Sequence, residues 1–291
     1  MHSKTVIGLA VAGIIVAVAA VGTTSSAYAA DLKCEPEKVA EKYPGIAGKT
    51  IKIGADPQTP PYVYRDAEDF NKLIGFDVDM AKFVFDCAGV ETEYQLGGWS
   101  GLLPALAATQ IDVMWDTLYY TAERAEQVDY IVYMQAATGA LTQAGNPKGI
   151  KSMDDLCGNG TAVGLGTVEE AAMRDKSKEC TDAGKEAIEI KTYPDMAAGF
   201  RLITNSRTDI VLTDLTQTMT MVKKDPTVYG LAFKIFTGFK IGAAVKNDDN
   251  DLLRAIHDGI QIAQATGMQA KIHEKYVMDP ALQLPTEVLL K

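Results

Sequence analysis

The chain has 291 residues, of which 47% are hydrophobic and 23% are charged. This composition is that of a core-forming protein and excludes a disordered or collagen-like chain. Acidic residues outnumber basic ones by 38 to 28, and the formal net charge of −10 argues against non-specific binding to nucleic acid. The length predicts one or two domains, with a small molecule or a protein as partner and no nucleic acid.

The N-terminus has the pattern of a secretory signal peptide. Lys4 precedes an uncharged apolar run over residues 6–21, and the small residues that follow end in Ala27-x-Ala29. A permanent membrane anchor is the alternative, but the run is shorter than the roughly 18–20 apolar residues that a spanning helix needs. We therefore predict a signal peptide over residues 1–29 and export of the remaining chain.

Four cysteines follow this segment: Cys34, Cys87, Cys157 and Cys180. In an exported protein an even number indicates disulfides, and four cysteines permit three pairings. Of these we favour Cys157 with Cys180 and Cys34 with Cys87. Zinc is the competing interpretation, but the sequence has no Cys-x-x-Cys and no histidine near the cysteines. We therefore expect no metal and no cofactor. Lys33 stands where a lipid-attachment motif at Cys34 needs a small residue, so we also expect no lipid anchor.

Strands and helices are expected to alternate after a charged, helical lead-in at about residues 34–43. The first series has strands at 51–54, 91–95 and 111–115, with helices at about 75–89 and 100–108. The second series has strands at 162–165, 188–192 and 210–213, with helices at 168–174 and 196–205. Short connections between alternating strands and helices are typical of a parallel α/β sheet. We therefore predict an α/β fold.

An aspartate follows the last strand of each series, Asp116 in the first and Asp214 in the second. Open parallel sheets bind ligands at the carboxyl ends of their strands, in the crevice where the connections diverge. If the two series form separate lobes, the two carboxylates face each other across a cleft.

Seven short motifs stand in a characteristic order. They are PPYVY at 60–64, GFDVDMA at 75–81, WSGLLPAL at 99–106, TAERAEQVDY at 121–130, DLCG at 155–158, VGLGT at 163–167 and DIVLTD at 209–214. Through these motifs the sequence resembles the periplasmic solute-binding proteins of ABC importers, in particular the polar amino acid group (family 3). The resemblance extends from about Ile51 to Tyr276.

The resemblance implies a two-lobed periplasmic binding protein fold of type II. Each lobe is then a mixed, mostly parallel sheet flanked by helices, and two hinge crossings join the lobes near residues 133–139 and 233–237. Lobe 1 is expected to comprise residues 30–138 and 238–291, and lobe 2 residues 139–237. Closure of the lobes around the ligand is the expected working cycle.

The implied function is capture of a small polar, amino-acid-like solute in the periplasm and its delivery to an ABC permease in the inner membrane. The implied protein is soluble and monomeric, and it is not an enzyme.

The arginine of the Thr-x-x-Arg motif, Arg124, is the residue that the resemblance assigns to the ligand α-carboxylate. A planar guanidinium makes two parallel charge-assisted hydrogen bonds to a carboxylate, which lysine cannot do. The alternative is a surface arginine that pairs with Glu123 or Glu126, an interaction usually worth under about 1 kcal/mol.

The resemblance also assigns roles to the segment Gly166-Thr167 and to Asp214. Backbone N–H groups at Gly166 and Thr167, at the start of a helix, are expected to face the same carboxylate, and Thr167 also caps that helix. Asp214 is expected to hold the ligand ammonium, because a desolvated charge is costly unless it is paired. The alternative for Asp214 is a cap of the helix that begins at Leu215.

Aromatic walls complete the expected cleft. The candidates are Tyr62, Trp99, Trp115 and Tyr119, together with Asp56 in the ligand-binding set. An aromatic face holds an apolar side chain or a cation, although each of these aromatic residues has the alternative of an ordinary core position.

The segment 114–121 departs from the family pattern, which has small hydroxyl residues where this chain has Trp115, Asp116 and Tyr119. Thr117 keeps a hydroxyl for the ligand carboxylate or amine. Asp116 has two explanations: it meets a second positive charge on the ligand, or it orients Arg124. One expected cation and two expected anions in the cleft, Asp116 and Asp214, favour a ligand that is cationic or bears an aromatic amine.

Two other functions stay open from the sequence. Exported cyclohexadienyl dehydratases use the same scaffold and a general acid in the cleft, which Asp116 or Glu169 would supply here. A sensor or accessory module that binds a ligand and transports nothing is the other alternative.

Overall fold

The computed structural model describes residues 33–290. The predicted signal peptide lies outside these described residues. Among the described helices, none combines the length and the apolar character that a membrane-crossing helix needs.

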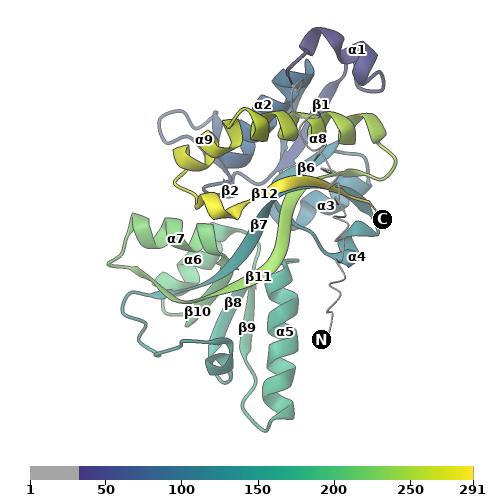
Figure 1. Ribbon diagram of the computed structural model, residues 1–291. Coiled ribbons are helices and arrows are strands. Elements are labelled where there is room, and N and C mark those ends of the chain that lie inside the picture. The colour runs from purple at the N-terminus through teal and green to yellow at the C-terminus, as the bar shows by residue number, and fades with distance from the viewer. Residues whose placement is uncertain (1–32, 291) are drawn as a thin grey trace, which may run out of the picture. The chain divides into compact units, whose positions relative to one another are not determined.

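One large mixed sheet runs through the described chain (Figure 1). Its strands in spatial order are β5 (Glu91–Leu96), β1 (Thr50–Ala55), β6 (Val113–Tyr119), β11 (Tyr229–Lys246), β7 (Val128–Gln143), β10 (Ile210–Asp214), β8 (Gly160–Gly164) and β9 (Glu189–Tyr193). A further strand, β12 (Gln283–Leu289), pairs with β7. A small second sheet consists of β2 (Gln58–Thr59), β3 (Val63–Arg65) and β4 (Leu73–Ile74).

Helices cover this sheet and connect its strands. The α-helices are α1 (Val39–Lys42), α2 (Phe76–Ala88), α3 (Trp99–Ala107), α4 (Ala122–Ala125), α5 (Val168–Asp182), α6 (Met196–Thr204), α7 (Leu215–Lys224), α8 (Asn250–Ala265) and α9 (Met268–Lys275). Three short 3-10 helices are η1 (Pro36–Lys38), η2 (Met153–Leu156) and η3 (Pro280–Leu282). The strands β5, β1 and β6 are mutually parallel, as are β9, β8 and β10.

The two long antiparallel strands β7 and β11 pass from one half of the molecule to the other (Figure 1). One half, which we call lobe 1, has a core made by apolar residues up to Ala136 and again from Phe239 onward. Those between Ala140 and Phe233 pack in the other half, which we call lobe 2, except Val168, which packs against the lobe 1 core. The β7–β11 register shifts between Phe236 and Lys240, so the pairing is irregular where the chain passes between the two cores.

The predicted α/β class and the two strand-like crossings are confirmed. Strand β6 starts at Val113, two residues later than expected, and continues to Tyr119 because all of its residues are buried between β1 and β11. Helix α5 continues to Asp182, well past the predicted end, and a salt bridge between Lys178 and Asp182 supports its last turn. The small sheet and helices α8 and α9 had no counterpart among the predicted elements.

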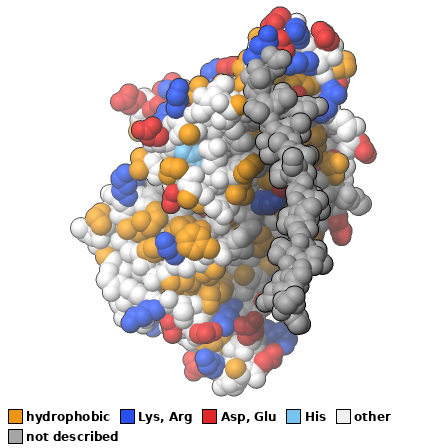
Figure 2. Space-filling view, in the orientation of Figure 1, with side chains coloured by type: hydrophobic (Ala, Val, Ile, Leu, Met, Phe, Trp, Pro, Cys, Tyr) orange, Lys and Arg blue, Asp and Glu red, His pale blue; other side chains and the backbone are white. Residues whose placement is uncertain are grey.

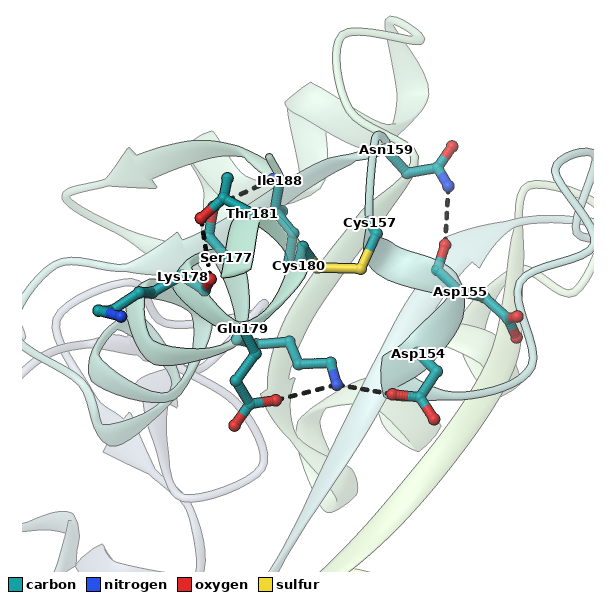
Figure 3. The surroundings of a disulfide bond; sticks show 11 residues. Asp154, Asp155, Cys157, Asn159, Ser177, Lys178, Glu179, Cys180, Thr181 and Ile188 are labelled. Carbon is teal, nitrogen blue, oxygen red and sulfur yellow. Dashed lines mark hydrogen bonds and ion pairs between the residues drawn. A yellow bond between two sulfur atoms is a disulfide. The ribbon is translucent and has the colours of Figure 1, made fainter. Parts of the chain in front are cut away.

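Both favoured disulfides are confirmed: Cys34 bonds to Cys87 and Cys157 bonds to Cys180. The second bond ties the chain just before β8 to the last turns of α5 (Figure 3). Lys176 reinforces this connection, because its Nζ lies 2.6 Å from Asp154 and 3.1 Å from Glu179. The far end of α5 is therefore anchored in lobe 2.

The surface carries both signs of charge. On the face drawn in Figure 2, Lys, Arg, Asp and Glu side chains intermix at the two ends of the molecule, and hydrophobic side chains gather around its middle. On this face, charges of both signs are therefore mixed.

Candidate ligand-binding site

A cavity of about 70 Å³ lies where two parallel strands of each lobe end. Asp56 follows β1, Tyr119 ends β6, Gly164 ends β8 and Asp214 ends β10, and all four residues line the cavity. The ends of parallel strands are where backbone connections diverge and leave a crevice for a ligand. Of the predicted site residues, Asp56, Trp99, Thr117, Tyr119, Arg124, Thr167 and Asp214 line this cavity.

Arg124 stands in α4 on the lobe 1 side. Its Nη1 donates to the carbonyl of Tyr119 and its Nη2 to the carbonyl of Gly166, both at 2.9 Å. Its guanidinium carbon lies 5.2 Å from the centre of the Trp99 ring, in cation–π geometry. Both hydrogen-bond partners are neutral carbonyls, and burial lowers the pKa of Arg124. No carboxylate within residues 33–290 forms a salt bridge with this partly buried cation, so a ligand anion is a suitable partner for it.

Thr117 adds a free hydroxyl to the same cavity. Its φ of 50° lies in the left-handed region, which is strained for a β-branched residue. Its N–H donates to Asp77 Oδ2 at 2.8 Å, and this bond holds the strained backbone in place. Its buried Oγ1 has no hydrogen-bond partner among the described residues. A buried hydroxyl without a partner is costly, so a ligand group is the natural acceptor or donor for it.

Asp77 supports Thr117 from within the core. Its Oδ1 accepts from the Tyr133 hydroxyl at 2.8 Å, and that hydroxyl accepts from Trp115 Nε1 at 2.8 Å. Burial raises the pKa of Asp77 to about 6. Trp115 therefore serves the wall behind the cavity and does not line it.

Thr167 begins the lobe 2 part of the site. Its Oγ1 donates to the Gly164 carbonyl at 2.9 Å and accepts from Glu170 N at 3.2 Å, so it caps α5 as predicted. The expected free N–H at Gly166 is corrected by the structure, because this N–H donates to Glu170 Oε2 at 2.7 Å. Gly166 instead contributes its carbonyl to Arg124.

Asp214 is at once a helix cap and a cavity residue. Its Oδ1 accepts from the N–H groups of Thr216 and Gln217 at the start of α7. Two lobe 1 hydroxyls also reach its carboxylate: Tyr62 donates to Oδ1 at 3.1 Å and Tyr119 to Oδ2 at 2.8 Å. Burial raises the pKa of Asp214, and these hydrogen bonds oppose the rise. The two interpretations of Asp214 from the sequence are therefore compatible in geometry.

Asp116 is the main correction to the expected site. Its side chain is fully buried and accepts from Asp56 N and from Thr59 Oγ1, both at 2.7 Å. It neither lines the cavity nor contacts Arg124, because its carboxylate fastens the loop after β1. Tyr62 is likewise buried behind the cavity and extends only its hydroxyl to Asp214.

Several lining residues were absent from the predicted ligand set. They are Thr59, Gly164, Leu165, Val168, Glu169, Tyr193, Pro194, Asp195, Met196, Leu212, Thr213 and Gln217. Most of them follow the carboxyl end of a strand or begin the next helix, so the strand-end rule that selected Asp214 would have found them. Glu169 had been considered only as a general acid of the dehydratase alternative.

The charge tally inside the cavity consequently changes. Among the described residues that line it, Arg124 is the one cation, and the carboxylates are Asp56, Glu169, Asp195 and Asp214. Burial raises the pKa of Glu169 and of Asp56. The cavity therefore has a larger excess of carboxylates over cations than the sequence indicated. Asp214 is a member of both sets, but Asp116 is not in the cavity.

Comparison with known proteins decides the family. The sequence model of the bacterial extracellular solute-binding proteins, family 3, matches residues 51–279. The chain belongs to this family. This family 3 protein has the predicted type II periplasmic binding protein fold, which is confirmed by its structural neighbours.

Three proteins that are similar to this family 3 protein follow. The L-cystine-binding protein TcyJ of Escherichia coli (strain K12) is 28% identical over 228 residues, which cover 78% of this chain and 82% of TcyJ. An ancestral arginine-binding protein bound to arginine is 30% identical with a TM-score of 0.71, covering 78% of this chain and 97% of that one. The ancestral amino acid-binding protein AncCDT-1, a precursor of cyclohexadienyl dehydratase, is 26% identical with a TM-score of 0.70, covering 83% and 98%.

Proposed function

We propose that this protein is the periplasmic binding component of an ABC importer, which captures an amino-acid-like solute between its lobes and delivers it to an inner-membrane permease. The observation that carries the proposal is the partly buried Arg124 guanidinium, whose hydrogen-bond partners within residues 33–290 are both carbonyls, in one cavity with a Thr117 hydroxyl that has no partner in the same range. A ligand carboxylate satisfies both groups at once. The relatives that bind amino acids support this ligand chemistry.

The second end of the ligand is assigned to the acidic part of the cavity. A carboxylate bound at Arg124 places the ammonium of an α-amino acid within a cavity that is lined by four protein carboxylates. Opposite charges at the two ends fix a zwitterion in one orientation, since each desolvated charge then has a partner. We assign ligand contacts to Arg124, Thr117 and Asp214, with Trp99 and Tyr119 as aromatic walls.

We place the lobe boundaries at residues 138/139 and 237/238, where β7 and β11 pass between the two cores. Closure then brings Tyr62 and Tyr119 of lobe 1 onto Asp214 of lobe 2, and Arg124 onto Gly166. A monomer that opens and closes at these crossings is consistent with the irregular β7–β11 register there.

A thermal-shift screen of the purified mature protein against the common amino acids, amines and aromatic acids tests the proposal. A ligand that binds only the folded state raises the melting temperature, by an amount that grows with its concentration relative to its Kd. We expect at least one amino acid to produce a shift, and micromolar affinity corresponds to about −8 kcal/mol. A screen in which no amino acid shifts the melting temperature contradicts the proposal.

One observation favours a second candidate function. Glu169 is a buried carboxyl in the cavity, and its raised pKa is a property of general acids. A dehydratase of the cyclohexadienyl type needs such a proton donor beside its substrate. Incubation of the protein with prephenate or arogenate decides the point, because turnover supports the enzyme and unchanged substrate eliminates it.

A further inference from the structure

We propose that Glu169 is the residue that selects a positive charge on the ligand side chain, so that the solute is a basic amino acid. This inference rests on the proposed function, because it takes the cavity as an amino acid site with the ligand carboxylate at Arg124. It assigns a specificity-determining residue and a ligand class to that site.

Glu169 is placed for this role at the first turn of α5. It lines the cavity and its residue is only 6% exposed. Its Oε1 accepts a hydrogen bond from Thr138 Oγ1 at 3.1 Å, and its own N–H and the Thr167 hydroxyl also favour its charged form, but burial outweighs them and raises its pKa. It forms no salt bridge with any residue in the described range 33–290. A buried carboxylate with so little compensation is expensive to keep unless a cation enters or a proton binds.

The other cavity carboxylates are better supplied by the protein. Asp214 receives two backbone N–H groups and two tyrosine hydroxyls. Asp56 receives the N–H groups of Gln58 and Trp99. Asp195 caps α6 and is partly exposed. Glu169 is therefore the buried cavity carboxylate whose hydrogen-bonding capacity is least used within the described chain.

Arg124 forms no salt bridge with Glu169 within residues 33–290, and its attraction to that carboxylate is weaker than the effect of its own burial on its pKa. Its guanidinium donates to two carbonyl oxygens and faces the Trp99 ring. A ligand carboxylate takes up the charge of Arg124, and a ligand ammonium takes up that of Asp214. Two buried carboxylates then remain, Asp56 and Glu169, and Asp56 already accepts two backbone N–H groups. A ligand with a second cationic group supplies a partner for Glu169.

An independent observation shows that the cavity is incomplete without a ligand. Thr117 Oγ1 lines it, lacks a partner among the described residues, and belongs to a residue that is only 7% exposed. The acidic excess is thus part of a site with an unmet hydrogen-bonding group and not a cluster of solvated surface carboxylates.

Isothermal titration with two matched pairs of amino acids tests the inference. Arginine and citrulline have nearly the same shape and differ in charge, as do lysine and norleucine at the chain end. We expect the wild-type protein to bind the cationic member of at least one pair tenfold or more tightly than its neutral partner. Glu169→Gln is expected to weaken that cationic ligand tenfold or more and to leave the neutral one within about twofold.

Two further variants keep the result interpretable. Glu179→Gln makes the same change on the same helix at an exposed carboxylate paired with Lys176, and is expected to leave all affinities unchanged. Glu169→Asp keeps the charge and is expected to retain the preference for the cationic ligand. This variant tests the role of the charge even if Glu169→Gln does not fold.

Each outcome has a separate meaning. Wild-type protein that binds neutral or acidic amino acids without a preference for the cation overturns the role of Glu169 and leaves the proposed function standing. If a folded Glu169→Gln variant still prefers the cationic ligand, the role of Glu169 is also overturned and the proposed function still stands. Wild-type protein that binds no amino acid overturns both.

Discussion

The two charged ends of the cavity are satisfied in different ways. The Arg124 end holds a partly buried guanidinium whose hydrogen-bond partners are two neutral carbonyls. The Asp214 end holds a buried carboxylate that accepts four hydrogen bonds from helix α7 and from two tyrosines. The protein's own hydrogen bonds therefore hold the Asp214 carboxylate in place without a ligand, whereas the Arg124 guanidinium depends on the ligand for a counter-charge.

The largest effect is expected from Arg124→Lys. Lysine keeps the charge but loses the planar fork, so the ligand carboxylate is left with one donor where two were aligned. Loss of one hydrogen bond to a charged group costs about 1.5–3 kcal/mol, a range that includes a loss of affinity of roughly 30-fold. Isothermal titration measures it, with Arg254→Lys on the exposed side of α8 as the control. An unchanged Kd would remove Arg124 from the site.

The next effect concerns stability and not affinity. Replacing Cys157 and Cys180 by serine opens a loop with a sequence separation of 23 residues, for which the chain-entropy account gives a loss of about 3 kcal/mol. Urea unfolding of the folded variant measures the loss. Because the bond anchors the far end of α5 and not its first turn, ligand affinity at 25 °C is expected to change less than threefold. A large loss of affinity would show that the two ends of the cavity depend on this anchor.

Asp77 links the basic end to pH. Its pKa is raised to about 6 by burial, so the folded state holds the proton more tightly than the unfolded state does. This contribution to stability is full below about pH 4 and is lost as the pH rises through about 6. A shift of this size corresponds to about 2–3 kcal/mol. The free energy of unfolding of wild type minus that of Asp77→Asn is therefore expected to fall by that amount between pH 4 and pH 7.

Asp86→Asn serves as the control for Asp77, because Asp86 is an exposed carboxylate on the same helix. A pH-independent difference between wild type and Asp77→Asn would show that Asp77 is not the group that titrates. A difference in the free energy of unfolding that rises with pH would show that the pKa of Asp77 is lowered by folding and not raised.

The smallest effect is expected at the Asp214 end. Tyr119→Phe removes one of four hydrogen bonds to Asp214, which corresponds to about 1 kcal/mol or roughly a fivefold change in affinity. The three remaining donors keep the carboxylate in place. A loss as large as that of Arg124→Lys would contradict the difference between the two ends.

The sequence predicted the parts of this molecule that periodicity and strand ends determine. Strand and helix alternation gave the α/β class, and the aspartate after the last strand of the second series is indeed a cavity residue at Asp214. The cap at Thr167 followed from its position between a strand and a helix. These features depend on local chain geometry, so a single sequence is enough for them.

The parts that the sequence did not predict depend on contacts between distant segments. Asp116 stands at a strand end like Asp214, but its carboxylate is taken by Asp56 and Thr59, some 60 residues away in the chain. All residues of β6 are buried, so no polar and apolar alternation marks which face looks into the cavity. The N–H of Gly166 was similarly lost to Glu170, a partner that the cap motif alone does not reveal.

The central claim is that a ligand α-carboxylate is bound by Arg124, and a cycle of titrations tests it most directly. The amino acid with the largest thermal shift and its α-carboxamide are each titrated into wild type and into Arg124→Lys. We predict that removing the carboxylate and removing the guanidinium each weaken binding roughly 30-fold or more, and that both together weaken it little further. Losses that multiply, or an amide that binds wild type as tightly as the acid, would contradict the claim.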